Sequence, residues 1–189
     1  MKIPEFHGLT DATTKVIDGH NRQVDEVQHR VANGEQQLSD LSRQVSEPWP
    51  KLARRRDELR AEVFSARQEQ LAAVLRADEL LRGLTAELQE LRETHVKTQA
   101  KVVARVEKDL RKAGLAPEQN PVWAVNPDTA VARFNHSVAL SEDVRKAQGD
   151  VDQCEQDLQT VDRLRREAGQ QSAAMGEQLR KLAANWLGI

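Results

Sequence analysis

Histidine and cysteine side chains are the first candidates for metal-binding or nucleophilic chemistry in this sequence. The five histidines are His7, His20, His29, His95 and His136. No two of them stand four residues apart, the spacing of a zinc-binding pair on one helical face, and the single cysteine is remote from all of them. The sequence also lacks a glycine-rich phosphate loop, a nucleophile elbow and the paired Glu-x-x-His motifs of di-iron bundles. We therefore expect no enzymatic activity, no bound metal and no cofactor.

A row of positively charged side chains is the strongest pattern that fits binding. Its members, separated by steps of four, four, three and four residues, are Lys97, Lys101, Arg105, Lys108 and Lys112. Such spacing places all five on one face of a helix. This face, the basic stripe, fits an acidic protein, a phosphate backbone or an anionic lipid surface. The alternative is a solvated face that complements the negative C-terminal end of the helix dipole.

Trp123 and Cys154 each allow two interpretations. Trp123 lies in a proline-rich stretch without periodicity, and tryptophan is enriched at binding hot spots, so it is a candidate partner contact. Alternatively, Trp123 packs as a plug on Phe134 or Val131. Cys154 lies among regularly spaced apolar residues, which favours a buried, unreactive thiol over a reactive one. A single cysteine excludes an intramolecular disulfide and fits a reducing compartment.

Long helices must position these residues. From Val144 to Trp186, apolar residues recur at alternating steps of three and four, interrupted by Arg165 and Ser172. This repeat is typical of a helix that packs on other helices. The main residues of this interhelical seam are Val144, Val151, Cys154, Leu158, Val161, Met175, Leu179, Leu182 and Trp186.

Prolines, glycines and helix-capping residues divide the chain into an N-terminal arm and three predicted helices. Residues 1–9 form the arm, and residues 10–189 form a single coiled-coil domain with helices over about 10–46, 51–113 and 127–187. Thr10 and Asn126 are expected N-caps, Gly114 is an expected C′ residue with positive φ, and prolines at 48 and 50 end the first helix. We predict an all-α fold: an elongated antiparallel coiled-coil hairpin of two long helices, with a third, shorter N-terminal helix packed on one half.

The matched lengths of the two long helices predict their register. If residue 113 faces residue 128, the numbers of facing residues total about 241. Arg165, which interrupts the seam, is a candidate pairing residue that Asp78 or Glu79 on the facing helix would neutralise. The half of the hairpin near Trp123 is expected to be only two helices thick. Covering its apolar surface favours a homodimer.

Composition separates the possible function classes. Charged residues make up 31%, aromatic residues 3%, and the net charge is −2. Neither a membrane-spanning stretch nor the apolar core of a secretory signal is evident, so we expect a cytoplasmic protein.

Three functions fit this composition. The first is a non-enzymatic coiled-coil interaction protein (an adaptor, stalk or assembly factor) that acts through helix–helix contacts with protein partners. In outline it resembles secretion-apparatus stalk proteins and rotary-ATPase central stalks. The second is membrane-surface binding, because three long helices that dimerise resemble a BAR module in outline. The third is binding to nucleic acid. The negative net charge and the lack of stacking aromatic residues near the basic stripe argue against this function. No small-molecule substrate is expected.

Overall fold

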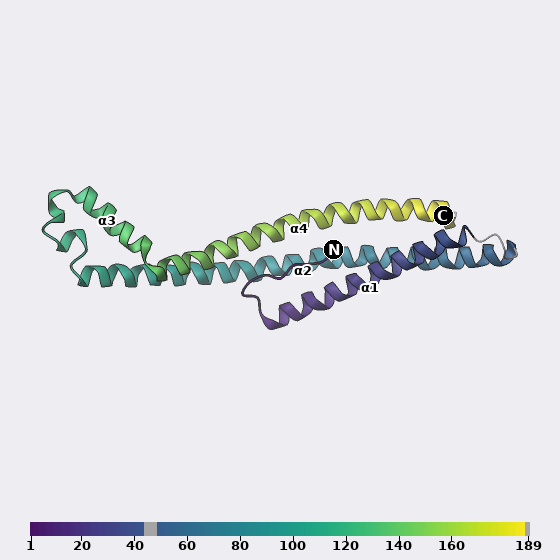
Figure 1. Ribbon diagram of the computed structural model, residues 1–189, viewed down its shortest axis with the longest axis horizontal. Helices are drawn as coiled ribbons and strands as arrows, with labels where there is room; N and C mark the ends of the chain where they lie inside the picture. The colour runs from purple at the N-terminus through teal and green to yellow at the C-terminus, as the bar shows by residue number, and fades with distance from the viewer. Residues whose placement is uncertain (44–48, 188–189) are drawn as a thin grey trace. The chain divides into compact units, whose positions relative to one another are not determined.

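The structure of the protein is a computed structural model that describes residues 1–43 and 49–187. Its helices are α1 (Asp11–Leu41), α2 (Trp49–Lys112), α3 (Pro127–Leu140) and α4 (Glu142–Leu187) (Figure 1). Two 3-10 turns, η1 (Pro117–Gln119) and η2 (Trp123–Val125), lie between α2 and α3. The described ranges contain no β-strand, which confirms the predicted all-α class.

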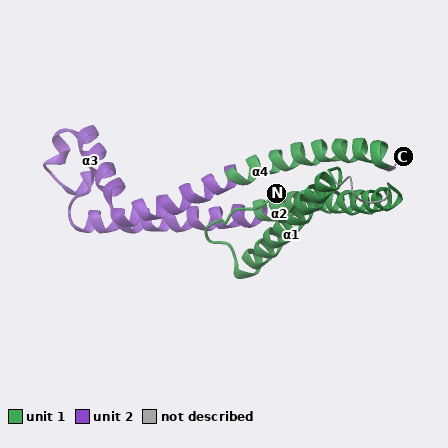
Figure 2. Cartoon of the chain, turned by 45° about the vertical axis from the view of Figure 1, so that its right-hand side comes forward, with its two compact units in different colours: residues 1–85, 160–189 green, residues 86–159 purple. Residues whose placement is uncertain are grey.

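Two compact units divide the chain (Figure 2). Unit 1 contains residues 1–85 and 160–189, and unit 2 contains residues 86–159. Since α2 and α4 both contribute to each unit and pack against each other there, the predicted helical hairpin is confirmed. The shorter helix α1 packs in unit 1.

In unit 2, side-chain pairs show that α2 and α4 run antiparallel. Arg92 Nη2 lies 2.6 Å from Glu155 Oε1, and Arg105, further along α2, pairs with the earlier residue Asp143 on α4. The predicted register was wrong in this unit, because it placed residue 92 opposite about residue 149 rather than residue 155. The prediction assumed one unbroken helix after the loop, and that assumption fails.

The predicted helix over 127–187 is in fact two helices that meet at Ser141. Ser141 has φ −57° and ψ 130°, an extended conformation. Its N–H donates to the Val138 carbonyl (3.1 Å) and its own carbonyl accepts from the Arg145 N–H (3.0 Å), so it ends α3 and begins α4. The apolar pattern is also irregular here. Val138, Ser141 and Val144 are separated by two consecutive steps of three, where the seam of α4 alternates between three and four.

The ends of α2 and α3 follow the predicted capping chemistry. Gly114 has φ 71°, its N–H donates to the Arg111 carbonyl, and the Leu115 N–H donates to the Leu110 carbonyl (both 3.0 Å). These two bonds form a Schellman motif. Asn126 Oδ1 accepts from the Thr129 N–H (3.2 Å), as expected of an N-cap.

The predicted ends of the first and last helices are only partly tested. Helix α1 begins after Thr10, whose hydroxyl accepts from the Thr13 N–H (3.3 Å), and it ends at Leu41, earlier than predicted. The predicted end near residue 46, the proline at position 48 and the predicted stop at residue 188 lie outside the described residues. Pro50 occupies the first turn of α2, where its missing N–H removes no hydrogen bond.

The core of unit 1 joins α1, α2 and α4. Ala77 and Leu81 of α2 and Val161 of α4 are fully buried. Gly34 of α1 lies against Val63 of α2, close to where Arg30 pairs with Glu69. Small and aliphatic side chains therefore fill this core, as the low aromatic content requires.

The N-terminal arm folds back onto α1. Ile3 is only 1% exposed, its N–H donates to Asn21 Oδ1 (2.9 Å), and Asn21 Nδ2 donates to the Ile3 carbonyl (2.8 Å). His20 Nε2 lies 2.9 Å from the Met1 carbonyl, which can only accept, so Nε2 is the protonated nitrogen. One side-chain amide thus satisfies both backbone groups of a buried residue, as a neighbouring strand would.

Candidate interaction surfaces

The seam of α4 is buried in its first half and half-buried in its second. Val144, Val151, Cys154 and Val161 are buried. The remaining predicted seam residues are partly exposed: Leu158, Met175, Leu179, Leu182 and Trp186. The apolar repeat therefore continues beyond the part of α4 that is fully covered.

The buried line of α4 also shifts by one position in its middle. Asp157 and Leu164 are buried, each one residue before a position of the predicted seam, while Leu158 and Arg165 are half-buried. Gln153 Nε2 donates to Asp157 Oδ1 (3.0 Å), which partly satisfies that carboxylate. Sequence reasoning missed both residues. A strict heptad repeat and the 3.6-residue turn of a straight helix drift apart, and this drift is the one signal that predicts such a shift.

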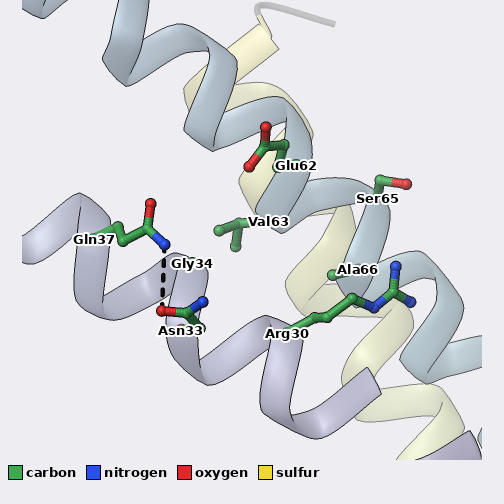
Figure 3. A pocket seen from close by; sticks show the side chains of 8 residues that line it. All are labelled: Arg30, Asn33, Gly34, Gln37, Glu62, Val63, Ser65 and Ala66. Atoms are coloured by element: carbon green, nitrogen blue, oxygen red, sulfur yellow. Dashed lines mark hydrogen bonds between the residues drawn. The ribbon is translucent and has the colours of Figure 1, made fainter. Parts of the chain in front are cut away.

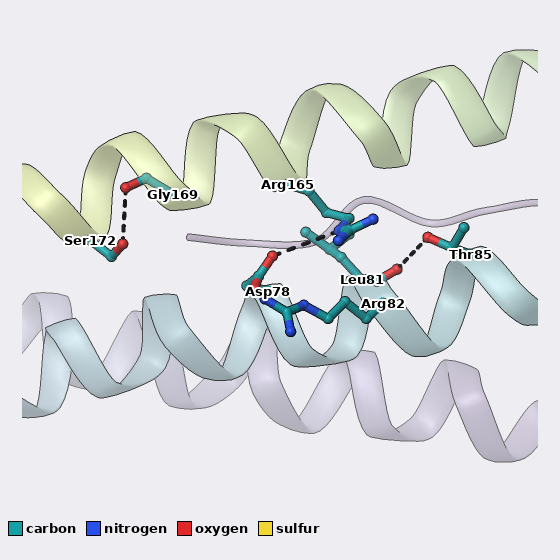
Figure 4. A network of polar contacts seen from close by, with 7 residues as sticks. All are labelled: Asp78, Leu81, Arg82, Thr85, Arg165, Gly169 and Ser172. Carbon is teal, nitrogen blue, oxygen red and sulfur yellow. Dashed lines mark hydrogen bonds and ion pairs between the residues drawn. The ribbon is translucent and has the colours of Figure 1, made fainter.

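Arg165 is paired as the sequence predicted. Its Nε lies 3.8 Å from Asp78 Oδ1, and Asp78 also accepts from Arg82 Nη2 at 2.6 Å (Figure 4). Arg165 Nε is buried and has no hydrogen-bond partner among the described residues, so its contact with Asp78 is an ion pair only. Nearby, the Ser172 hydroxyl donates to the Gly169 carbonyl (3.0 Å), which satisfies the second polar interruption of the seam within its own helix.

The end of α2 that lies in unit 1 contacts α1. Leu52 and Leu59 cluster with Leu41, and Leu38 packs against this group. The guanidinium of Arg60 on α2 stacks over the ring of Trp186 on α4 at 5.7 Å. The last turns of α4 carry a row of apolar side chains that are only partly covered. We call Met175, Leu179, Leu182 and Trp186 the α4 stripe.

A groove with polar walls lies between α1 and α2. Gly34 and Val63 lie at its floor, and its walls carry amide, hydroxyl and charged side chains (Figure 3). Arg30, the cation of this groove, is already paired with Glu69. The lining of the groove contains one carboxylate, Glu62, one hydroxyl, Ser65, and no histidine.

All five residues of the basic stripe are exposed on α2 in unit 2. Two of them have acidic partners: Lys97 Nζ lies 4.0 Å from Glu93 Oε2, and Arg105 pairs with Asp143. Lys101, Lys108 and Lys112 form no ion pair with any residue that the structure describes. The stripe is therefore only partly neutralised within the chain.

Trp123 is partly buried as a plug, and its neighbours are exposed. It packs against a cluster that contains Phe134, Val138 and Val144. By contrast, Val122 and Val125 on either side of it are 77% and 88% exposed. The sequence analysis singled out the tryptophan and missed these valines, because neither composition nor periodicity distinguishes the residues of a non-repeating loop.

The environments of His20 and Cys154 change their acid–base behaviour. Burial, the largest effect, lowers the pKa of His20, and nearby Arg76 acts in the same direction. His20 Nδ1 is buried without a hydrogen-bond partner among the described residues. Burial raises the pKa of the Cys154 thiol, and Asp157 and Asp150 add to this effect.

The described residues also bear on metal and membrane chemistry. They contain no group of three or more His, Cys, Asp or Glu side chains placed to hold a metal ion. Within 1–43 and 49–187, no helix combines the length and apolar character that crossing a bilayer requires.

Comparison with known proteins adds no assignment. No family model matches the sequence, and neither a curated protein nor a solved structure matches it.

Proposed function

We propose that the protein is a non-enzymatic helical interaction protein (an adaptor, stalk or assembly factor) that acts through helix–helix contacts and forms a homodimer. The α4 stripe carries this proposal. Its residues continue an apolar repeat that packs against other helices earlier in α4, yet they remain partly exposed. A seam with this repeat is stable when a facing helix covers it. The reduced, buried Cys154 is compatible with a cytoplasmic location.

The energy left in the α4 stripe favours a weak, concentration-dependent dimer. Full burial of a large apolar side chain contributes about 2 kcal/mol, so a side chain that is at most about one third exposed retains no more than roughly 0.7 kcal/mol. Two copies of a four-residue stripe then supply at most about 6 kcal/mol, which lies at the lower end of the cost of association. Symmetric pairing of identical stripes covers this surface with the fewest assumptions about the partner.

Light scattering coupled to size exclusion, over a wide range of protein concentration, tests the proposal. The wild type is expected to approach twice the mass of the chain as concentration rises, and Leu179→Gln/Leu182→Gln is expected to stay monomeric with unchanged helix content. The matched control is Ala173→Gln/Ala184→Gln, which changes exposed positions on the same helix and should dimerise normally. A wild type that remains monomeric throughout, or two variants that dimerise equally well, would refute dimerisation through this stripe.

A further inference from the structure

Three lysines of the basic stripe, Lys101, Lys108 and Lys112, have no acidic partner among the residues that the structure describes. Successive helical residues are about 100° apart, so Glu107 points away from the stripe, whereas Asp109, four residues after Arg105 and three before Lys112, borders it. From Lys97 to Lys112 the stripe extends for roughly 22 Å at 1.5 Å per residue. The side chains that pack inward, Val106 and Leu110 among them, lie on the opposite side of α2. A surface on which cations predominate therefore faces solvent, with Glu93 beside Lys97 and Asp143 beside Arg105.

Exposed apolar side chains lie in the loop that follows this part of α2. The loop that carries them is fixed to the end of α2, because Arg111 pairs with Glu118 in η1 and Trp123 packs into the cluster that includes Leu110. Burial of Trp123 leaves Val122 and Val125 directed to solvent. Unit 2 thus presents lysines and exposed valines at one end.

The combination of lysines and exposed valines in unit 2 fits some classes of anionic partner better than others. Protein interfaces are depleted in lysine and centre on exposed aromatic or arginine anchors, whereas here Trp123 and Phe134 pack inside the unit. Single-stranded nucleic acid is bound by bases stacked on aromatic side chains, and exposed valines contribute nothing to a phosphate contact. An anionic bilayer surface, by contrast, attracts lysines to its headgroups and accepts apolar side chains just below them.

We propose that this end of unit 2 binds an anionic phospholipid surface, with Lys101, Lys108 and Lys112 at the headgroups and Val122 and Val125 inserted among them. Arg105 and Lys97 contribute less, because acidic side chains already pair with them. This site goes beyond the proposed dimerisation and shares no residue with the α4 stripe. Either proposal can therefore fail without the other.

Sedimentation of the full chain with large unilamellar vesicles tests this site. The probe is phosphatidylcholine with phosphatidylserine at about 7:3, compared with pure phosphatidylcholine at low and high salt. Each lysine near an anionic surface contributes about fivefold in partitioning, so Lys101→Gln/Lys108→Gln/Lys112→Gln should lower the partition coefficient roughly a hundredfold. Val122→Ser/Val125→Ser should also weaken binding, whereas Val16→Ser, an exposed valine on α1, should not.

The matched control changes the same number of charges elsewhere. Lys15→Gln/Lys51→Gln/Lys146→Gln removes three exposed lysines outside the stripe and reaches the same net charge. It should partition like the wild type. Equal losses in both triple variants, or no salt-sensitive sedimentation of the wild type, would overturn the proposal. So would fluorescence anisotropy in which the stripe variant loses affinity for an oligonucleotide while vesicle binding is unchanged.

Discussion

Replacing Gly34 by alanine tests how closely α1 and α2 cross. A Cβ atom at Gly34 would lie 2.6 Å from Val63 Cγ2, roughly 0.9–1.4 Å inside the normal carbon–carbon contact of about 3.5–4.0 Å (Figure 3). Val63 is 1% exposed and β-branched, so its side chain has little freedom to rotate away. The ion pairs Arg30–Glu69 and Arg67–Glu35 join the same two helices near this crossing. Relief of the clash therefore requires the helices themselves to move apart.

Two opposing energies decide the sign of the change. Alanine improves on glycine in a helix by about 1 kcal/mol. Inserting a methyl group into a packed core costs about 1–3 kcal/mol, and a contact this short on a stiff neighbour belongs at the upper end. We expect Gly34→Ala to lower the free energy of unfolding by about 1–2 kcal/mol in urea denaturation followed by circular dichroism.

Matched variants separate the clash from helix propensity. Gly83→Ala and Gly19→Ala change helical glycines whose added Cβ meets nothing within 4 Å, so each should raise the unfolding free energy by up to about 1 kcal/mol. In a Val63→Ala background, which removes the clashing methyl groups, Gly34→Ala should become neutral or stabilising. If Gly34→Ala in the wild-type background stabilises the protein as much as Gly83→Ala does, the close crossing is refuted.

Three further predictions concern polar groups in the cores. Because burial lowers the pKa of His20, the unfolded state takes up a proton first, and stability should fall as pH decreases from about 6.5 toward the native pKa. Urea titrations near pH 7.5 and pH 5.5 should show a steeper pH dependence for the wild type than for His20→Gln, and equal slopes would exclude this role. Asp78→Ala should cost about 1–3 kcal/mol, because it leaves Arg165 unpaired in the seam, whereas Arg165→Met should change the unfolding free energy by less than about 1 kcal/mol, since Asp78 keeps Arg82. Denaturation midpoints that reverse this order would contradict the pairing. The buried Cys154 thiol, with its raised pKa, should react with a maleimide or disulfide reagent far more slowly in the folded protein than in urea, and equal rates would mean that it is accessible.

Local chemistry explains what the sequence predicted well. The caps at Gly114 and Asn126 depend on side chains within a few residues, so they can be recognised without knowledge of the fold. The hairpin follows from a long, regular seam and two helices of matched length, and the Arg165–Asp78 pair follows from a charge that interrupts this seam.

Other features depend on contacts that leave little trace in the sequence. Two consecutive steps of three from Val138 to Val144 do not distinguish a break at Ser141 from one irregular turn in a long helix. Attachment of the arm through Asn21 has no periodic signature, because one amide side chain pairs with one distant residue. The exposed valines of unit 2 become visible only when the packing of Trp123 is known.

The joint at Ser141 affects how tolerant the chain is to changes in length. In an uninterrupted coiled coil, one added residue turns every later side chain by about 100° and moves the seam off its partner. An extended residue between α3 and α4 can absorb such a rotation through its backbone dihedrals. Insertions or deletions within residues 114–140 are therefore expected to leave the packing face of α4 intact, so this part of the protein can vary in length while the hairpin keeps its alignment.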